Sequence, residues 1–135
     1  KRLQVFDVQS GNAIKTIGNN ISPNDVAVLT PPNSPPLIFA SEYYNNRVRV
    51  FDALSGDVVR DIGNGNGANP GQLNEPRGLS IFHNTAAGRY ELYVSEMNNH
   101  RVSIFNALTG EYLGVIGKQG SGNGELDYPY ENCLI

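Results

Sequence analysis

Short runs dominated by apolar and β-branched residues recur along the chain, each five or six positions long and bounded by Gly, Asn or Pro. Residues 47–51 read Arg-Val-Arg-Val-Phe, and closely similar phrases stand at residues 2–6 and 101–105. Runs of this length and composition predict β-strands rather than helices. A Gly stands five residues after the Phe of each phrase, and another follows seven residues later. This spacing predicts that each phrase is the first strand of a β-hairpin.

Two of the three phrases are preceded by two further strand-like runs. With the strands of one repeat lettered a to d, we predict them at residues 25–29, 37–41, 47–51 and 58–62, and again at 78–82, 91–95, 101–105 and 112–116. Residues 2–17 supply only strands c and d, and the chain from about residue 132 supplies only strand a. The phrases are 45 and 54 residues apart, a period typical of a repeated four-stranded β-module rather than of a helical hairpin.

Four antiparallel strands per module, packed face to face on the next module, are typical of the blade of a β-propeller. We therefore predict an all-β fold, an open β-propeller segment with the strand order c-d, a-b-c-d, a-b-c-d, a. The predicted blades span residues 1–18, 23–63, 76–117 and 129–135, the first and last being partial. Because both ends fall within predicted strands, we expect the chain to be part of a longer one. Further blades or self-association would then cover its open apolar flanks.

Composition narrows the class of partner. Hydrophobic residues make up 39% and charged residues 17% of the 135 positions, which is typical of a soluble globular protein. The net charge of −3 and the scatter of the ten basic residues disfavour nucleic acid as a default partner, because phosphate binding needs clustered Lys and Arg. No apolar run approaches the ~18 residues of a membrane span, so no membrane partner is expected.

Cys133 is the only cysteine, which excludes a disulfide within this segment and a cysteine-based metal site. At the same distance from a preceding Pro, the earlier repeats have the small residues Ala27 and Ser80. We therefore expect Cys133 to be a packed thiol rather than a reactive one. An unpaired cysteine mildly favours a reducing compartment such as the cytoplasm, although composition leaves the localisation open.

The corner between strands b and c carries a more specific pattern. Glu42 is followed by Asn-Asn-Arg-Val at residues 45–48, and Glu96 is followed by Asn-His-Arg-Val at residues 99–102. After strand d, Gly-rich segments lead to a Pro in both complete repeats. Together with the phrases ending in Phe, these features resemble NHL repeats over the whole chain. Two departures from the family pattern are Glu in place of the usual Asp and a short link at residues 19–22.

The resemblance implies a propeller that has six blades when complete. The family's roles are diverse: protein-binding propellers in ubiquitin ligases, RNA-binding propellers, extracellular sensor domains and related metal-dependent amidating lyases. The family by itself therefore implies the fold more strongly than any one activity.

Glu42 with Arg47, and Glu96 with Arg101, recur at the same place in both complete repeats. We interpret each as a structural ion pair across the b–c corner, because a specific ligand site rarely repeats once per blade. The alternative is that these charges recognise a ligand. If the pairs are buried, removing one partner would cost about 3–5 kcal/mol.

Signals for catalysis are weak in this segment. The Gly-rich stretches at residues 63–67 and 120–124 lack the following helix and the Gly-Lys-Ser/Thr ending of phosphate loops. A zinc site needs three or four protein ligands, and the two histidines, His83 and His100, are predicted in loops on opposite faces of one blade. We predict that the segment is not an enzyme and holds no cofactor or metal. A lyase-like enzyme whose metal ligands lie in other blades is a second alternative.

The b–c and d–a loops are predicted to emerge on one face of the blades, where they gather aromatic, amide and thioether side chains. The candidate binding residues are Tyr43, Tyr44, Asn45, Asn46, Met97, Asn98, Asn99 and His100. Tyr and Met beside Asn are typical of adaptable protein-binding surfaces, so we predict a protein-binding or scaffolding module that uses this face.

Two other interpretations of the same face stay open. In the first, the propeller binds RNA, with Tyr43 and Tyr44 stacking on bases near Arg47. In the second, one of the two tyrosines simply packs on the next blade.

Overall fold

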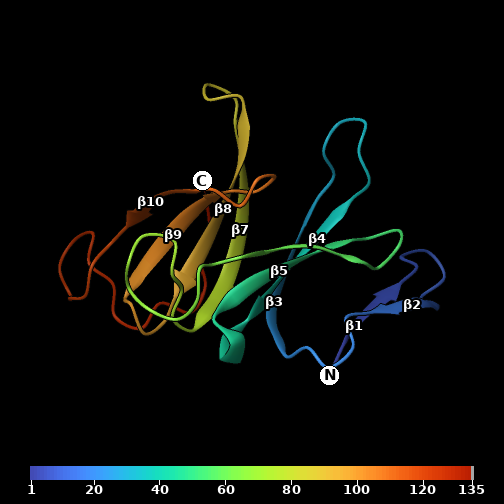
Figure 1. Cartoon of the computed structure of the whole chain (residues 1–135), viewed down its shortest axis with the longest axis horizontal. Coiled ribbons are helices and arrows are strands. Elements are labelled where there is room, and N and C mark those ends of the chain that lie inside the picture. Colours follow the sequence, from blue (N-terminus) through green and yellow to red (C-terminus); the bar gives the residue numbers. More distant parts are fainter. Residues whose placement is uncertain (135) are drawn as a thin grey trace.

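Three antiparallel β-sheets follow one another across the molecule, each built from consecutive strands (Figure 1). The structure is a computed structural model and describes residues 1–134. The first sheet pairs β1 (Leu3–Phe6) with β2 (Ala13–Ile17). The second sheet contains, in order, β3 (Pro23–Leu29), β4 (Leu37–Glu42), β5 (Arg47–Asp52) and β6 (Val58–Ile62). The third contains β7 (Pro76–Asn84), β8 (Arg89–Glu96), β9 (Arg101–Asn106) and β10 (Tyr112–Ile116).

The predicted all-β class is confirmed, and so is the strand order as far as β10, with one hairpin followed by two sheets in which strands a to d are neighbours. The only helical element within residues 1–134 is a single 3-10 turn, η1 (Tyr43–Asn45), at the b–c corner of the second sheet. Strand a of a following repeat was predicted at the end of the chain, but residues 129–134 form no strand, and Ile135 lies outside the described residues. In both complete sheets strand a pairs with strand b. The described residues contain no b strand of a following repeat, so residues 129–134 have no such ladder to join.

The repeated phrase adopts the same register in every sheet. The Phe of each phrase is paired with a residue of strand d, and a bulge interrupts the ladder at or next to this pair: Phe6 with Ala13, Phe51 with Val58 and Phe105 with Tyr112. The Gly of each connecting turn has a positive φ, for example 82° at Gly56, a conformation that Gly adopts without a steric penalty. The sequence repeat is therefore a repeat of backbone geometry.

Two hydrophobic clusters fill the spaces between successive sheets. Phe51 packs with Ile17 between the first and second sheets, and Phe105 packs with Val48 between the second and third. Both rings are 1% exposed, whereas Phe6 is 57% exposed. Because the Phe of each phrase points toward the preceding sheet, and no sheet precedes β1 within the described residues, the ring of Phe6 has nothing to pack against.

The links between sheets lie beside the b–c corners. Leu73, in the link between β6 and β7, is buried in the cluster between the second and third sheets. The backbone N–H of Glu75, in the same link, donates to Asn46 Oδ1 at 2.9 Å. The short link at residues 19–22 buries Ile21 between the first two sheets in the same way. Links and corners therefore share one end of the molecule, as the sequence analysis predicted.

Candidate functional site

The corner of the third sheet is held by a fully buried carboxylate. Glu96 and Arg101 are opposite each other in the ladder of β8 and β9, and Arg101 Nε donates to Glu96 Oε2 at 2.7 Å. The other oxygen, Oε1, accepts hydrogen bonds from the backbone N–H of Asn74 at 3.1 Å and from Asn99 Nδ2 at 2.6 Å. Arg101 also donates to the carbonyl oxygens of Ala68 and Gln72. The ion pair thus fastens the link of residues 64–75 to the corner.

The equivalent pair in the second sheet, Glu42 with Arg47, is formed but is less well supported. Glu42 is buried, and its Oε1 has no hydrogen-bond partner within residues 1–134. Arg47 forms a second ion pair, in which its Nη1 lies 3.1 Å from Asp61 Oδ2. Asp61 is in turn paired with Arg49, whose Nε lies 2.8 Å from Asp61 Oδ1. The hydrogen bonds from Arg49 hold the pKa of Asp61 below its ordinary value.

The difference between the two corners follows partly from link length, and partly from Asn99 and Ser103, whose side chains also donate to Glu96. In the third sheet the long preceding link supplies the backbone donor at Asn74 and the acceptors at Ala68 and Gln72. The link before β3 has only residues 19–22, which supply no such groups to Glu42 or Arg47. Both ion pairs expected from the sequence are therefore present, but they are not equivalent.

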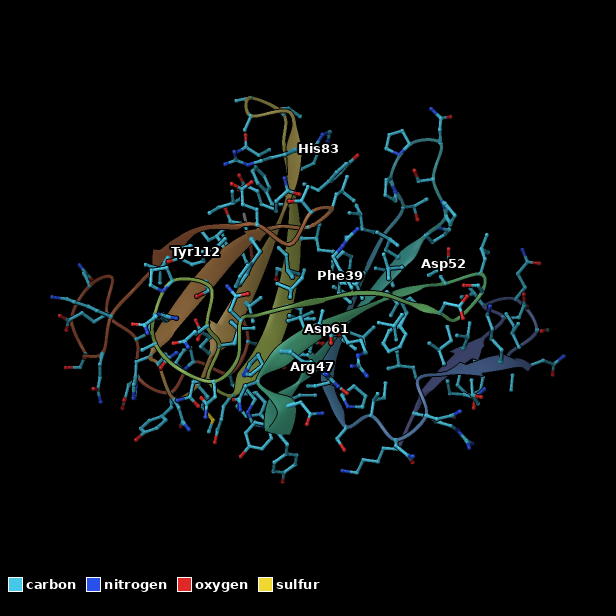
Figure 2. The ribbon with its side chains drawn as sticks, viewed as in Figure 1. Phe39, Arg47, Asp52, Asp61, His83 and Tyr112 are labelled. Carbon is cyan, nitrogen blue, oxygen red and sulfur yellow. The ribbon has the colours of Figure 1, made fainter. Side chains whose placement is uncertain are left out.

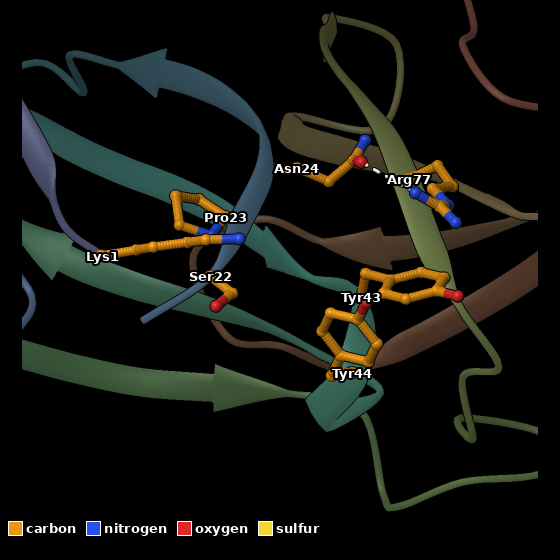
Figure 3. Close-up of a pocket in the computed structure, with 7 residues that line it drawn as sticks. All are labelled: Lys1, Ser22, Pro23, Asn24, Tyr43, Tyr44 and Arg77. Atoms are coloured by element: carbon orange, nitrogen blue, oxygen red, sulfur yellow. Dashed lines mark hydrogen bonds between the residues drawn. The ribbon is translucent and has the colours of Figure 1, made fainter. Parts of the chain in front are cut away.

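A stack of an arginine between two tyrosines joins three successive repeats, and sequence reasoning missed it. Figure 3 shows two of its members, Tyr43 and Arg77, with the hydrogen bond from Arg77 to Asn24. The guanidinium carbon of Arg77, at the start of β7, lies 3.7 Å from the centroid of the Tyr43 ring and 4.8 Å from that of Tyr130. Arg77 Nη1 donates to Asn24 Oδ1 at 2.9 Å and to the Tyr130 hydroxyl at 3.2 Å. Asn24, Arg77 and Tyr130 each follow a Pro at the same place in the repeat, Pro23, Pro76 and Pro129. Their repeat-equivalent positions were the one signal that could have brought them together.

Tyr44 stands beside this stack and separates two hollows. The ring of Tyr44 is 76% exposed and meets the Tyr43 ring edge-on, with 4.4 Å between centroids. The first hollow, of about 250 Å³, is lined by Lys1, Ser22, Pro23, Asn24, Tyr43, Tyr44 and Arg77. The second, of about 380 Å³, is lined by Tyr43, Tyr44, Asn46, Asn66, Asn74, Glu75 and Asn98. Aromatic rings and amide groups thus dominate this surface.

The predicted binding residues divide into exposed and scaffolding groups. The exposed ones are Tyr44, Asn45 and Asn98, with Tyr43 and Met97 half-buried. Asn99 is occupied by hydrogen bonds to Glu96 and to the carbonyl of Gly67. The alternative of packing on the next repeat describes Tyr43, which lies under Arg77 of the third sheet, but not Tyr44.

Asn46 and His100, the remaining two, play one structural role in successive sheets. Both have a φ of 52°, in the left-handed region. Asn46 Oδ1 accepts from the backbone N–H of Glu75, and the buried His100 accepts through Nδ1 from the backbone N–H of Tyr128 at 3.1 Å. Each side chain therefore binds the backbone N–H of the residue that precedes the next Pro, which is Pro76 or Pro129. His100 is therefore an anchor within the fold and has little surface to offer a partner.

The two histidines lie at opposite ends of the third sheet. The a–b connection is shorter than predicted, because His83 belongs to β7 and pairs with Tyr90, on which its ring stacks at 4.2 Å. Figure 2 shows His83 far from Arg47 and Asp61, at the other end of the molecule. Within residues 1–134 no group of three His, Cys, Asp or Glu side chains is arranged to hold a metal ion.

Cys133 is exposed, so the prediction of a packed thiol is wrong. The residues at the same repeat position, Ala27 and Ser80, lie within paired strands, whereas residues 129–134 are unpaired and leave the thiol uncovered. Among the described residues, no helix has the length and apolar character needed to cross a membrane.

No protein-family model and no curated protein sequence matches this chain. The class of the protein must therefore be argued from its internal repeats and its fold.

Proposed function

We propose that the chain is part of an NHL-type β-propeller, with six blades when complete. In this proposal it acts as a protein-binding module through the face where its b–c corners and links meet. The repeated register of three successive sheets supports the propeller. The recurrence of an acid, an Asn and an Arg at two b–c corners supports the NHL type. The two hydrophobic clusters between sheets fit the face-to-face packing of propeller blades.

The exposed ring of Tyr44 carries the proposal for binding. A large aromatic side chain that is 76% exposed, yet braced by the half-buried Tyr43, loses little conformational freedom when a partner covers it. The guanidinium of Arg77 stacks on the ring of Tyr43. Tyr43 and Tyr44, which line both hollows, are therefore held in place before a partner binds. The surrounding Asn side chains offer amide donors and acceptors to a peptide backbone.

Selection from a displayed peptide library tests this assignment. We expect peptides selected on the whole chain to lose at least about tenfold in affinity when Tyr44→Ala is introduced. Phe82→Ala is the matched control, because Phe82 is another exposed aromatic residue but lies near the far end of β7. Peptides that bind both variants as tightly as the parent chain would contradict the assignment, as would a failure to select any peptide.

Single-stranded RNA is the second candidate, favoured by the exposed Tyr44 ring flanked by the amides of Asn46 and Asn98. Against it, Arg47 is already neutralised by Glu42 and Asp61, and the net charge of the chain is −3. Fluorescence anisotropy with labelled oligouridine discriminates the two. Tight binding that weakens steeply with added salt would favour RNA over a protein partner.

A further inference from the structure

The second hollow, of about 380 Å³, is built by the two complete repeats. All of its lining residues stand between Tyr43 and Asn98 in the chain. They come from the b–c corners of the second and third sheets and from the link between β6 and β7. A volume of this size is in the range of small ligand sites, so the hollow can receive one long side chain of a partner.

Glu75 is the one charged residue in the lining of this hollow. Its side chain is 23% exposed, and its Oε2 is buried with no hydrogen-bond partner within residues 1–134. Arg77 Nη2 lies 3.8 Å from this oxygen, a distance that allows an ion pair but is too long for a hydrogen bond. The Glu75 carboxylate therefore keeps a capacity to accept N–H groups from a ligand.

Arg77 does not cancel the negative charge of Glu75 at this hollow. Its guanidinium stacks on Tyr43, donates to Asn24, and lines the first hollow rather than the second. Tyr43 lies between Arg77 and Tyr44 (Figure 3). Burial raises the pKa of the Tyr43 hydroxyl, and the charge of Glu75 raises that pKa by more than the charge of Arg77 lowers it. The net effect of the two charges at Tyr43 is therefore negative, which favours a cation nearby.

An aromatic face and free amide groups complete the lining. The ring of Tyr44 is 76% exposed, and a cation can stack on such a ring. The side chains of Asn66, Asn74 and Asn98 form no hydrogen bond with another residue of the part of the chain that the structure describes. Their carbonyl oxygens are acceptors for N–H donors. A carboxylate, an aromatic face and several acceptors together match a planar guanidinium, which has five N–H donors and no acceptor.

This combination of residues occurs at one corner only. In the next repeat, the positions of Tyr44 and Glu75 are occupied by Asn98 and Tyr128. The acid–arginine pairs of the b–c corners, in contrast, recur in both complete repeats because they hold the fold. A group of residues that does not recur at the equivalent corner is not required by the repeat geometry, which favours a role in binding.

We propose that the second hollow binds an arginine side chain of the protein partner, with its guanidinium paired to Glu75 and stacked on Tyr44. The proposal rests on the protein-binding function given above and specifies the chemistry of the partner. Arginine fits better than lysine, because the ammonium group of lysine is compact and cannot pair in a planar, two-pronged way with a carboxylate while it stacks on a ring.

The first probe is Nα-acetyl-L-arginine amide, titrated into the whole chain at constant ionic strength. We expect saturable shifts in the NMR signals of the side-chain amides of Asn66 and Asn98, with a Kd on the order of 1 mM. The matching citrulline amide, which has nearly the same shape without the charge, should bind at least about fivefold more weakly. This comparison leaves the chain unchanged, so it does not depend on the folding of any variant.

Variants of the chain then locate the site. Glu75→Gln should weaken binding of the arginine probe at least about fivefold, because it removes the charge and keeps the side-chain volume. Tyr44→Ala should weaken it about two- to fivefold, the range for a cation against an exposed ring. Glu111→Gln is the control, since it makes the same change of charge at an exposed residue between β9 and β10. Circular dichroism of each variant checks that the chain remains folded.

Peptides selected on the whole chain test whether the arginine belongs to a protein partner. We expect the selected peptides to contain an Arg whose replacement by citrulline weakens binding at least about fivefold. Combined with Glu75→Gln in the chain, this replacement should weaken binding no further than either change alone.

The possible failures of the two proposals are distinguishable. The absence of saturation at about 10 mM probe, or equal binding of the citrulline amide, would overturn the arginine site. Peptides that lose affinity on Tyr44→Ala but bind Glu75→Gln as tightly as the parent chain would also overturn it, and would leave the protein-binding function standing. Saturable binding of the arginine probe without any selected peptide would overturn the protein partner and assign the hollow to a small guanidinium compound.

Discussion

Removing the buried carboxylate of the third sheet should cost far more stability than removing its counterpart in the second. Glu96→Ala leaves Arg101, whose side chain is 13% exposed, without its ion-pair partner and frees the N–H of Asn74. Breaking a buried pair in this way costs about 3–5 kcal/mol, a large part of the ~5–15 kcal/mol that stabilises a typical domain. The link of residues 64–75 would also lose its attachment to the corner.

Glu42→Ala should cost only about 1.5–3 kcal/mol, the value of hydrogen bonds to a charged group. Arg47 keeps Asp61 as a partner, and the substitution also removes the buried Oε1 that has no hydrogen bond within residues 1–134. The two variants remove the same atoms, so the comparison measures what the link of residues 64–75 and the side chains of Asn99 and Ser103 add at the third sheet.

Urea unfolding followed by far-UV circular dichroism measures both losses, since the chain has no Trp to report by fluorescence. The exposed Glu111 provides the control, and Glu111→Ala should change the free energy of unfolding by less than about 0.5 kcal/mol. Equal losses for Glu96→Ala and Glu42→Ala, within about 0.5 kcal/mol, would refute the reasoning, as would a larger loss at Glu42.

Two further predictions concern the core and the pH dependence of stability. Phe51→Ala should cost about 3–5 kcal/mol, whereas Phe6→Ala should change the free energy of unfolding little, and equal shifts in Tm would contradict the assignment of their environments. Burial raises the pKa of Glu91, but hydrogen bonds from Arg89 and Tyr93 outweigh it and hold that pKa below its usual 4.5. Glu91 therefore stabilises the fold above this pH and loses its contribution as the pH falls through the lowered value. Measured Tm between about pH 5 and pH 2 should fall less steeply for Glu91→Gln, and parallel profiles would exclude this role.

The candidate surface was predictable only in part. The crowding of Tyr, Asn and Met at the b–c corners was visible in the sequence, and Tyr44 is exposed as expected. The anchoring roles of Asn46 and His100 were not, because a polar residue at a turn is as compatible with a ligand site as with a hydrogen bond to a link. The stack of Tyr43, Arg77 and Tyr130 brings together segments far apart in the chain, and no local pattern marks it.

The strands, their hairpins and their repeated register follow from local information. Alternating apolar residues, β-branched side chains and turn Gly act within a few residues of one another, and each phrase carries all of them. Burial does not follow from such information. Phe6 and Phe51 have similar neighbours in sequence and the same place in the ladder, yet one is exposed and the other is buried. Within residues 1–134, only Phe51 has a preceding sheet to pack against. Likewise, Glu42 and Glu96 end equivalent strands, but only Glu96 also accepts from a residue of a long link, Asn74, and from the side chains of Asn99 and Ser103. Tertiary packing made these distinctions, since it alone determines which surfaces meet.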